Sequence, residues 1–245
     1  MSLFKVIGLG QKLLQRITVC IVGLAAMLGI GSAASMTVSM LLSVAVYALA
    51  FGWKFALGFV ILLFVHELGH LVASKVVGLK SSNPVFIPFL GAVIRIQDPK
   101  NAKMEANVAI GGPAMGTLSA LICLAFYLWT GDKLLLVLSY VGCLLNLFNL
   151  IPCSPLDGGR IAAAISQHMW WLGTIATGVL FLVTSNIFLL IVLVFSLIRL
   201  WVGDTNIDPR YYQISMRQRV KVAWWYFGLL FVLGTLALYL VDIVA

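Results

Sequence analysis

Charged residues are scarce in this chain: Asp, Glu, Lys and Arg together make up 10% of its 245 residues, against about 25% in soluble globular domains. Hydrophobic residues make up 62%. A soluble globular protein of ordinary composition is therefore excluded. The composition instead predicts an integral membrane protein, and we expect residues 1–245 to form one membrane-embedded domain.

Cysteine is also rare, and its placement excludes two further classes. The cysteines lie in or beside apolar segments and form no CxxC pair: Cys20, Cys123, Cys143 and Cys153. They indicate neither a disulfide framework nor a thiolate metal site. The net charge of +8 is spread over loops beside apolar runs, a pattern that orients membrane proteins, so we expect no nucleic-acid partner. We also expect no cleavable signal peptide, because the run after Arg16 continues into more apolar sequence.

Long apolar runs dominate what remains. A transmembrane helix needs about 20 apolar residues. The runs that reach or approach this length are 17–50, 54–74, 106–130, 134–152, 170–200 and 222–244. The 170–200 run is either one long span or two short ones broken at residues 184–186. The sequence therefore predicts an all-α polytopic membrane protein with six or seven transmembrane helices, located in the cell membrane.

Lysine and arginine cluster before residue 17 and again over residues 75–104. The positive-inside rule places both segments in the cytoplasm. The 17–50 run then crosses once, with a kink near Gly29 or as a partly re-entrant hairpin, and the 54–74 run returns. The 134–152 run returns to the same side. The ends of these two returning runs should therefore meet towards the cytoplasmic side.

Histidine and glutamate are rarer still, with three and two in the whole chain, yet residues 66–70 read His-Glu-Leu-Gly-His. Residues four apart lie on one face of a helix, so His66 and His70 can bind the same Zn²⁺. Glu67 lies beside that face, where its carboxylate can take a proton from a zinc-bound water. Ionisable groups are costly at membrane depth, which favours a metal site over the alternative, a buried polar network.

A catalytic zinc normally has three protein ligands and one open position, so one ligand is missing. Asp157 is the best candidate. It follows two prolines and precedes two glycines, in a segment that ends a helix just as the chain leaves an apolar run. The alternative is an ordinary interfacial turn in which Asp157 caps the next helix.

The pair of motifs His-Glu-Leu-Gly-His and Asn149-Leu-Ile-Pro-Cys-Ser-Pro-Leu-Asp157-Gly-Gly-Arg resembles the site-2 protease family of intramembrane zinc metallopeptidases. The resemblance covers about residues 37–165 and implies that the two histidines and Asp157 bind zinc, that Glu67 is the base and that Asn149 contacts substrate. It leaves residues 170–245 as accessory helices. We see no room for the PDZ insert or CBS tail of some members, so the chain is expected to be a compact form.

Two asparagines lie three residues apart, so one helix face can carry both Asn146 and Asn149 towards the zinc. For Asn146 we leave two roles open, substrate binding and an interhelical hydrogen bond. His168 lies beside two tryptophans and is expected at the membrane interface.

Residues 83–96 are apolar and β-branched, but two prolines and a central glycine disfavour a continuous helix. They predict a small membrane-dipping β-hairpin, with a packed loop as the alternative, and the family resemblance implies that such a hairpin pairs with substrate. Gly112 and Gly116 form a small-xxx-small pair, which suits either close helix packing or the lining of an active-site groove.

The sequence thus predicts a zinc metalloprotease that hydrolyses peptide bonds within or near transmembrane segments of membrane proteins. Its partners would be the lipid bilayer, a transmembrane protein substrate and an unidentified regulatory membrane protein. One alternative is a membrane zinc-binding protein or metal carrier without hydrolysis, in which a glutamate beside the open ligand position has no purpose. Another is an anchored protease for soluble substrates, whose third ligand would have to be Glu105.

Overall fold

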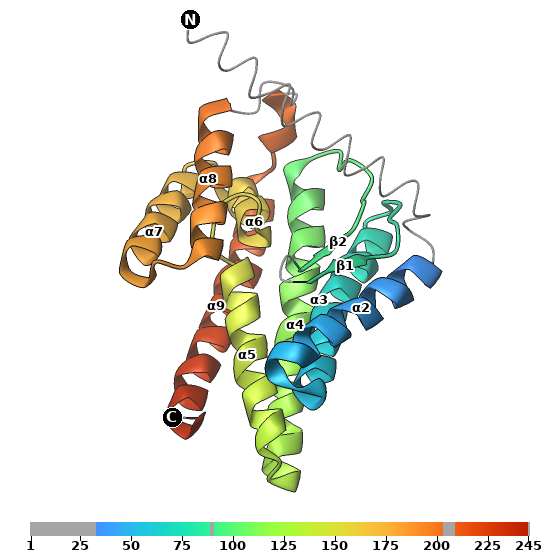
Figure 1. Cartoon of the computed structure of the whole chain (residues 1–245). Coiled ribbons are helices and arrows are strands. Elements are labelled where there is room, and N and C mark those ends of the chain that lie inside the picture. Colours follow the sequence, from blue (N-terminus) through green and yellow to red (C-terminus); the bar gives the residue numbers. More distant parts are fainter. Residues whose placement is uncertain (1–32, 89–90, 203–208, 245) are drawn as a thin grey trace, which may run out of the picture.

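The computed structural model describes residues 33–88, 91–202 and 209–244 (Figure 1). Its elements in chain order are α2 (Ala33–Phe51), α3 (Trp53–Val76), β1 (Val85–Ile87), β2 (Gly91–Val93), α4 (Ala102–Thr130), α5 (Lys133–Asn149), α6 (Asp157–Ile165), α7 (Met169–Thr184), α8 (Ile187–Val202), the 3₁₀ turn η1 (Pro209–Tyr212) and α9 (Met216–Val244). The predicted helical class and the small β-hairpin are both confirmed.

Four of these helices, α2, α3, α4 and α9, are long and apolar enough to cross a bilayer. The apolar helices α5, α7 and α8 have 17, 16 and 16 residues. At about 1.5 Å per residue they fall short of a hydrocarbon core about 30 Å thick. Within the described residues the structure therefore supports four full-length spans and does not confirm the predicted six or seven.

The 170–200 run is divided where the sequence suggested. Helix α7 ends at Thr184, Ser185 has a left-handed backbone (φ 51°), and α8 begins at Ile187. The two helices pack against each other as a hairpin. The first half of the 17–50 run, including Gly29 with its suggested kink, lies outside the described residues.

Residues with short polar side chains and glycines lie at the other helix ends. Gly52, with a positive φ, separates α2 from α3. Asn101 caps the start of α4 by accepting a hydrogen bond from Met104 N (3.0 Å), and Gly131 ends it in a left-handed conformation. Asp132 then caps α5. The sequence between the two helices is therefore just long enough for an antiparallel turn.

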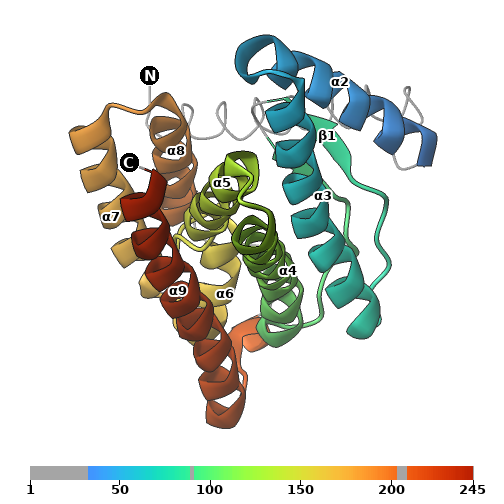
Figure 2. The same cartoon turned by 90° about the horizontal axis from the view of Figure 1, so that it is seen from below.

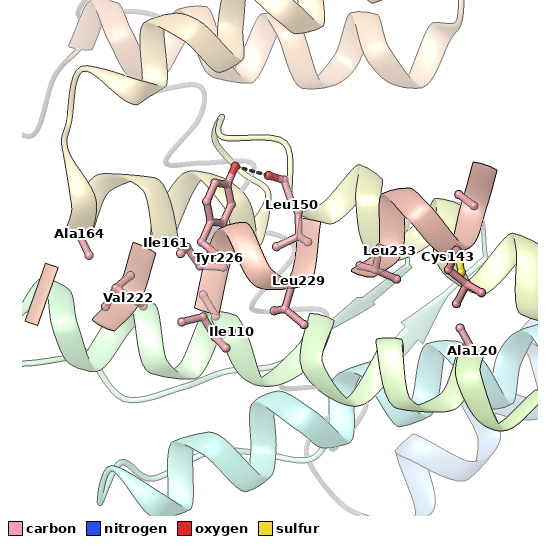
Figure 3. Close-up of a cluster of buried hydrophobic side chains, with 14 of the residues drawn as sticks. Ile110, Ala120, Cys143, Leu150, Ile161, Ala164, Val222, Tyr226, Leu229 and Leu233 are labelled. Atoms are coloured by element: carbon pink, nitrogen blue, oxygen red, sulfur yellow. Dashed lines mark hydrogen bonds between the residues drawn. The ribbon is translucent and has the colours of Figure 1, made fainter. Parts of the chain in front are cut away.

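The helices form a layered bundle. Seen from below in Figure 2, α4 and α5 lie at the centre, with α2 and α3 on one side and α9, α7 and α8 on the other. Helix α3 packs on α4, α4 packs on α5, and α9 packs on α4, α5 and α6. The largest apolar cluster lies where α9 meets these three helices (Figure 3), and Leu150, Ile161, Leu233 and Leu240 are fully buried in it.

The crossing of α3 and α4 depends on two glycines. A side chain at Gly69 would clash with the Gly111 carbonyl, and one at Gly111 would clash with the Gly69 carbonyl. The two backbones therefore touch directly, as is common where membrane helices cross closely. Gly69 is the fourth residue of the His-Glu-Leu-Gly-His motif, so the motif itself contains the contact point.

The hairpin has one covered edge and one open edge. In the antiparallel register Phe86 of β1 lies opposite Ala92 of β2. The Phe86 N–H does not point to β2, because it donates to Ser39 Oγ of α2 at 3.1 Å. The Phe86–Ala92 pair is therefore the non-hydrogen-bonded kind, and the N–H and C=O of Ala92 also point away from β1. Helix α2 closes one edge of the sheet, and Ala92 lies on the other.

The helix crossing gives a stability prediction. We expect Gly69→Ala to destabilise the fold by about 1–3 kcal/mol, because the added methyl group forces α3 and α4 apart. The matched control is Gly234→Ala in α9, where an added Cβ meets no atom within 4 Å; it should be neutral or slightly stabilising. Unfolding of both variants in mixed detergent micelles measures the difference. Equal stabilities would show that the α3–α4 crossing tolerates a side chain.

Candidate metal site

Two helices far apart in sequence bring three donor atoms together. His66 and His70 lie on α3 with their Nε2 atoms 3.2 Å apart. Asp157, the first residue of α6, places Oδ2 3.2 Å from His66 Nε2 and 3.1 Å from His70 Nε2. All three residues are buried, with 3%, 7% and 8% of their surface exposed. They are the one group with metal-ligand geometry in the described part of the chain.

Hydrogen bonds on the far side of each ring fix which nitrogen carries the proton. His66 Nδ1 lies 2.9 Å from Asn146 Oδ1. The orientation of that amide is set by its own nitrogen, which donates to the Gly142 carbonyl at 2.7 Å. His70 Nδ1 donates to the Val108 carbonyl at 2.9 Å. Both rings therefore carry their proton on Nδ1 and turn the lone pair of Nε2 inward.

Two nitrogen lone pairs and a carboxylate oxygen thus face one another in a buried space. Three acceptors at this range repel unless a cation lies between them. Ligand atoms about 2.0–2.1 Å from a tetrahedral zinc lie about 3.3 Å apart, close to the 3.1–3.2 Å of this group. The donor set of two nitrogens and one oxygen also suits zinc. The residues present therefore fit a zinc ion.

The glycines of α4 form the back wall of this group. A side chain at Gly112 would clash with the His70 ring and meet His66, and one at Gly116 would clash with the amide of Asn146. The two roles suggested for these glycines, close packing and lining of the site, are thus both partly right. The backbone of α4 does approach closely, but at Gly112 it approaches the histidine rings themselves.

A cavity of about 540 Å³ adjoins the three donors. Its polar wall includes Glu67, Asn149 and Arg160, and the residues of β2 line another side. Glu67 follows the first histidine on α3 and is half-buried. The cavity therefore brings together the suggested base Glu67, the three donors of the candidate metal site and the open edge of the hairpin.

The predicted site residues divide into two sets by position. His66, His70, Asp157, Glu67 and Asn149 all line the cavity. Asn146 lies behind His66, 2% exposed, and makes the interhelical hydrogen bond that was the alternative to substrate binding. The capping alternative for Asp157 is not what the structure has, since the residue before α6 is Leu156 and no side chain caps this helix.

Sequence reasoning missed three participants. The Val108 carbonyl orients His70, but every residue has a backbone carbonyl, so the sequence gives no sign of this contact. Arg160 was read only as the last letter of a motif, although it lines the cavity. Gly69 was not predicted as a contact point, because its place between the two histidines gives no sign of the contact with Gly111.

Known proteins that are similar to this chain include zinc metalloproteases. Residues 54–132 match the model of Peptidase family M50. A zinc metalloprotease of Methanocaldococcus jannaschii is 36% identical over 114 residues, covering 43% of this chain and 33% of the relative. The probable zinc metalloprotease EGY2 of Oryza sativa, a chloroplast protein, is 29% identical over 185 residues, covering 55% of this chain and 34% of the relative.

A solved site-2 protease from Methanocaldococcus jannaschii aligns with a TM-score of 0.45 and 24% identity, covering 69% of this chain and 88% of that one. The chain spans about a third of the length of the curated relatives it matches. The family match includes the whole of α3 after Trp53 and all of α4. The part of the chain that carries α3 and α4 is therefore similar to Peptidase family M50, and the curated relatives it matches are zinc metalloproteases.

The geometry predicts the metal content of the protein. We expect the detergent-purified chain to hold about one zinc ion, and His66→Ala and Asp157→Ala each to lose it, because either change removes one of three donors. His168→Ala is the control, since His168 is exposed and lies outside the cavity. Metal analysis of the four proteins measures the result. Zinc retained without Asp157 would separate the two motifs into unrelated sites.

Proposed function

We propose that this chain is an intramembrane zinc metalloprotease that cleaves peptide bonds within or near transmembrane segments of other membrane proteins. The observation that carries the proposal is the convergence of two histidine lone pairs and the Asp157 carboxylate on the wall of a cavity that also holds Glu67. A cation site with an adjacent carboxylate that is not one of its donors has the parts needed for hydrolysis.

Each residue of the site would have its own role in peptide-bond hydrolysis. Zinc, held by His66, His70 and Asp157, would supply Lewis-acid polarisation of the scissile carbonyl and of the attacking water. Glu67 would accept the proton of that water at its carboxylate and pass it to the leaving amine. Asn146 would keep the His66 ring in the tautomer that presents Nε2.

Asn149 is placed to hold the substrate. It lines the cavity, and its amide nitrogen donates one hydrogen bond, to the Leu145 carbonyl at 3.1 Å. An amide has two N–H donors, so the second is left for a substrate carbonyl or the developing oxyanion.

The open edge of β2 supports an unwound substrate. A transmembrane helix hides its carbonyls in its own hydrogen bonds, so the cleaved segment must be extended and its freed backbone groups paired. The N–H and C=O of Ala92 point away from β1, and Ala92 lines the cavity. Addition of the substrate as a third strand would satisfy both partners.

The depth of the site supports cleavage inside the bilayer. His66 lies ten residues before the end of α3 at Val76, which is about 15 Å along a helix. The loop after α3 is basic, with Lys80, Arg95 and Lys100, and by the positive-inside rule it lies in the cytoplasm. The site would therefore open towards the cytoplasmic side while lying well below the membrane surface. With α5, α7 and α8 as shorter crossings, the described helices would make seven crossings in all.

A zinc carrier remains the rival function. A carrier must hold and release the ion but needs no base beside it. Glu67 lies on the cavity wall without being one of the three donors, and that position favours hydrolysis.

Replacing the base tests the function directly. We expect Glu67→Gln to lower cleavage of a membrane substrate by at least about 100-fold, because proton transfer is lost, while zinc content stays normal. Glu105→Gln is the control, since Glu105 accepts a hydrogen bond from Tyr211 and lies outside the cavity. Cleavage at the wild-type rate would remove Glu67 from the mechanism. Loss of zinc transport in the absence of any proteolysis would instead support the carrier.

The open strand edge gives a second test. Proline is tolerated on an edge where its missing N–H faces outward, so Ala92→Pro should keep the hairpin and the zinc. It removes the donor offered to substrate, and we expect KM to rise about tenfold for one lost hydrogen bond of about 1.4 kcal/mol. Ala92→Val keeps the N–H and is the control. Equal KM values for the proline and valine variants would exclude pairing at Ala92.

A further inference from the structure

Helix α9 contacts the segment that presents Asp157. The Tyr226 hydroxyl of α9 donates a hydrogen bond of 2.7 Å to the Leu150 carbonyl, in the turn between α5 and α6 (Figure 3). Tyr226 is 2% exposed and Leu150 is fully buried. A buried tyrosine hydroxyl with one partner in an apolar cluster is a fixed contact, because losing that partner would leave both groups unpaired.

The same carbonyl touches the residue after Asp157. A side chain at Gly158 would clash with the Leu150 carbonyl, and one at Gly159 would clash with the Cys153 carbonyl. The start of α6 therefore rests directly on the backbone of the turn. The Leu150 carbonyl lies between Tyr226 on one side and Gly158 on the other, one residue from the carboxylate donor.

A second contact from α9 holds the other end of α6. Arg219 donates through one guanidinium nitrogen to the carbonyls of Ala164 (3.2 Å) and Ile165 (2.7 Å), and through the other to Tyr212 (2.8 Å). The first two belong to the last residues of α6, whose carbonyls lack partners within the helix. Arg219 and Tyr226 are seven residues apart, two turns of α9, and so lie on one face.

We propose that Arg219 and Tyr226 are positioning residues for the metal ligand Asp157, and that α9 is part of the frame of the active site. The proposal deepens the proposed function and rests on it, since it takes Asp157 to be a zinc ligand. Tyr226 acts through the Leu150 carbonyl, and Arg219 acts through the carboxyl end of α6.

The length of α6 explains why such support is needed. It has nine residues, and helices this short are marginal without tertiary contacts. Its second and third residues are glycines, which add backbone freedom next to Asp157. Without restraint at both ends, the carboxylate would not stay at the 3.1–3.2 Å range it keeps from the two rings.

The first experiment compares two tyrosines of α9. Tyr226→Phe removes only the hydroxyl, and Tyr239→Phe removes one from an exposed position, where Tyr239 is 54% exposed. In zinc-free protein, hydrogen exchange of residues 150–160 should be faster in Tyr226→Phe and unchanged in Tyr239→Phe. With zinc bound, Tyr226→Phe should lose the ion to a chelator about tenfold more readily, as for other changes behind a metal ligand. Unchanged exchange and unchanged zinc retention would overturn the proposal.

A third variant separates positioning from general stability. Leu233→Ala removes a fully buried side chain of α9 from the same apolar cluster but removes no hydrogen bond. It should lower the unfolding midpoint more than Tyr226→Phe does, yet retain zinc better. If zinc retention instead follows the unfolding midpoint across both variants, α9 acts only as packing and the proposal fails.

A further variant tests the contact of Arg219 with the end of α6. Arg219→Lys keeps the charge but cannot reach carbonyls on two sides at once, so it should also speed exchange near residues 157–165. Arg217→Lys, at an exposed position two residues away, is the control. Wild-type exchange in Arg219→Lys would exclude Arg219 from this role. A wild-type chain that binds no zinc would refute the proposed function, whereas normal zinc binding by all variants would refute only the role of α9.

Discussion

The structure is organised around three electron-pair donors that face one another inside an apolar bundle. Left alone, the two histidine nitrogens and the Asp157 oxygen would repel. The hydrogen bonds that the two rings donate, from His66 to the Asn146 side-chain oxygen and from His70 to the Val108 carbonyl, hold the rings in that arrangement. A bound cation would relieve this repulsion, so on the proposed function metal binding and folding of the central helices would be coupled.

Close backbone approach makes this arrangement possible. Gly69 and Gly111 bring α3 and α4 into contact, Gly112 leaves room for the rings, and Gly158 lets α6 rest on the preceding turn. At each of these positions a methyl group would have to occupy space filled by a carbonyl or an imidazole. The metal group is thus held by main-chain contacts as much as by its own side chains, and helix α9 continues the same frame on the far side of α6.

The meeting of His66, His70 and Asp157 could be predicted from the sequence because these residues are chemically conspicuous. Two histidines four apart in an apolar run, and an aspartate in a proline–glycine turn, are rare enough to be recognised without a structure. The hairpin was predicted from its prolines and its central glycine. The predicted six or seven spans are not confirmed, because α5, α7 and α8 have only 16 or 17 residues although they lie in apolar runs that approach spanning length. The contacts of Tyr226 and Arg219 could not be predicted from the sequence either. Each side chain donates a hydrogen bond to a backbone carbonyl more than fifty positions away, at Leu150 and Ile165.

The hairpin has one more consequence, for the choice of substrate. Its covered edge is closed by Ser39, and its open edge, at Ala92, lies inside a cavity of about 540 Å³. An intact helix offers no unpaired backbone groups to such an edge. On the proposed function, selection would then depend mainly on how readily a segment unwinds. A substrate would be recognised by the conformational weakness of its helix, from residues such as glycine and proline, more than by any particular side chain.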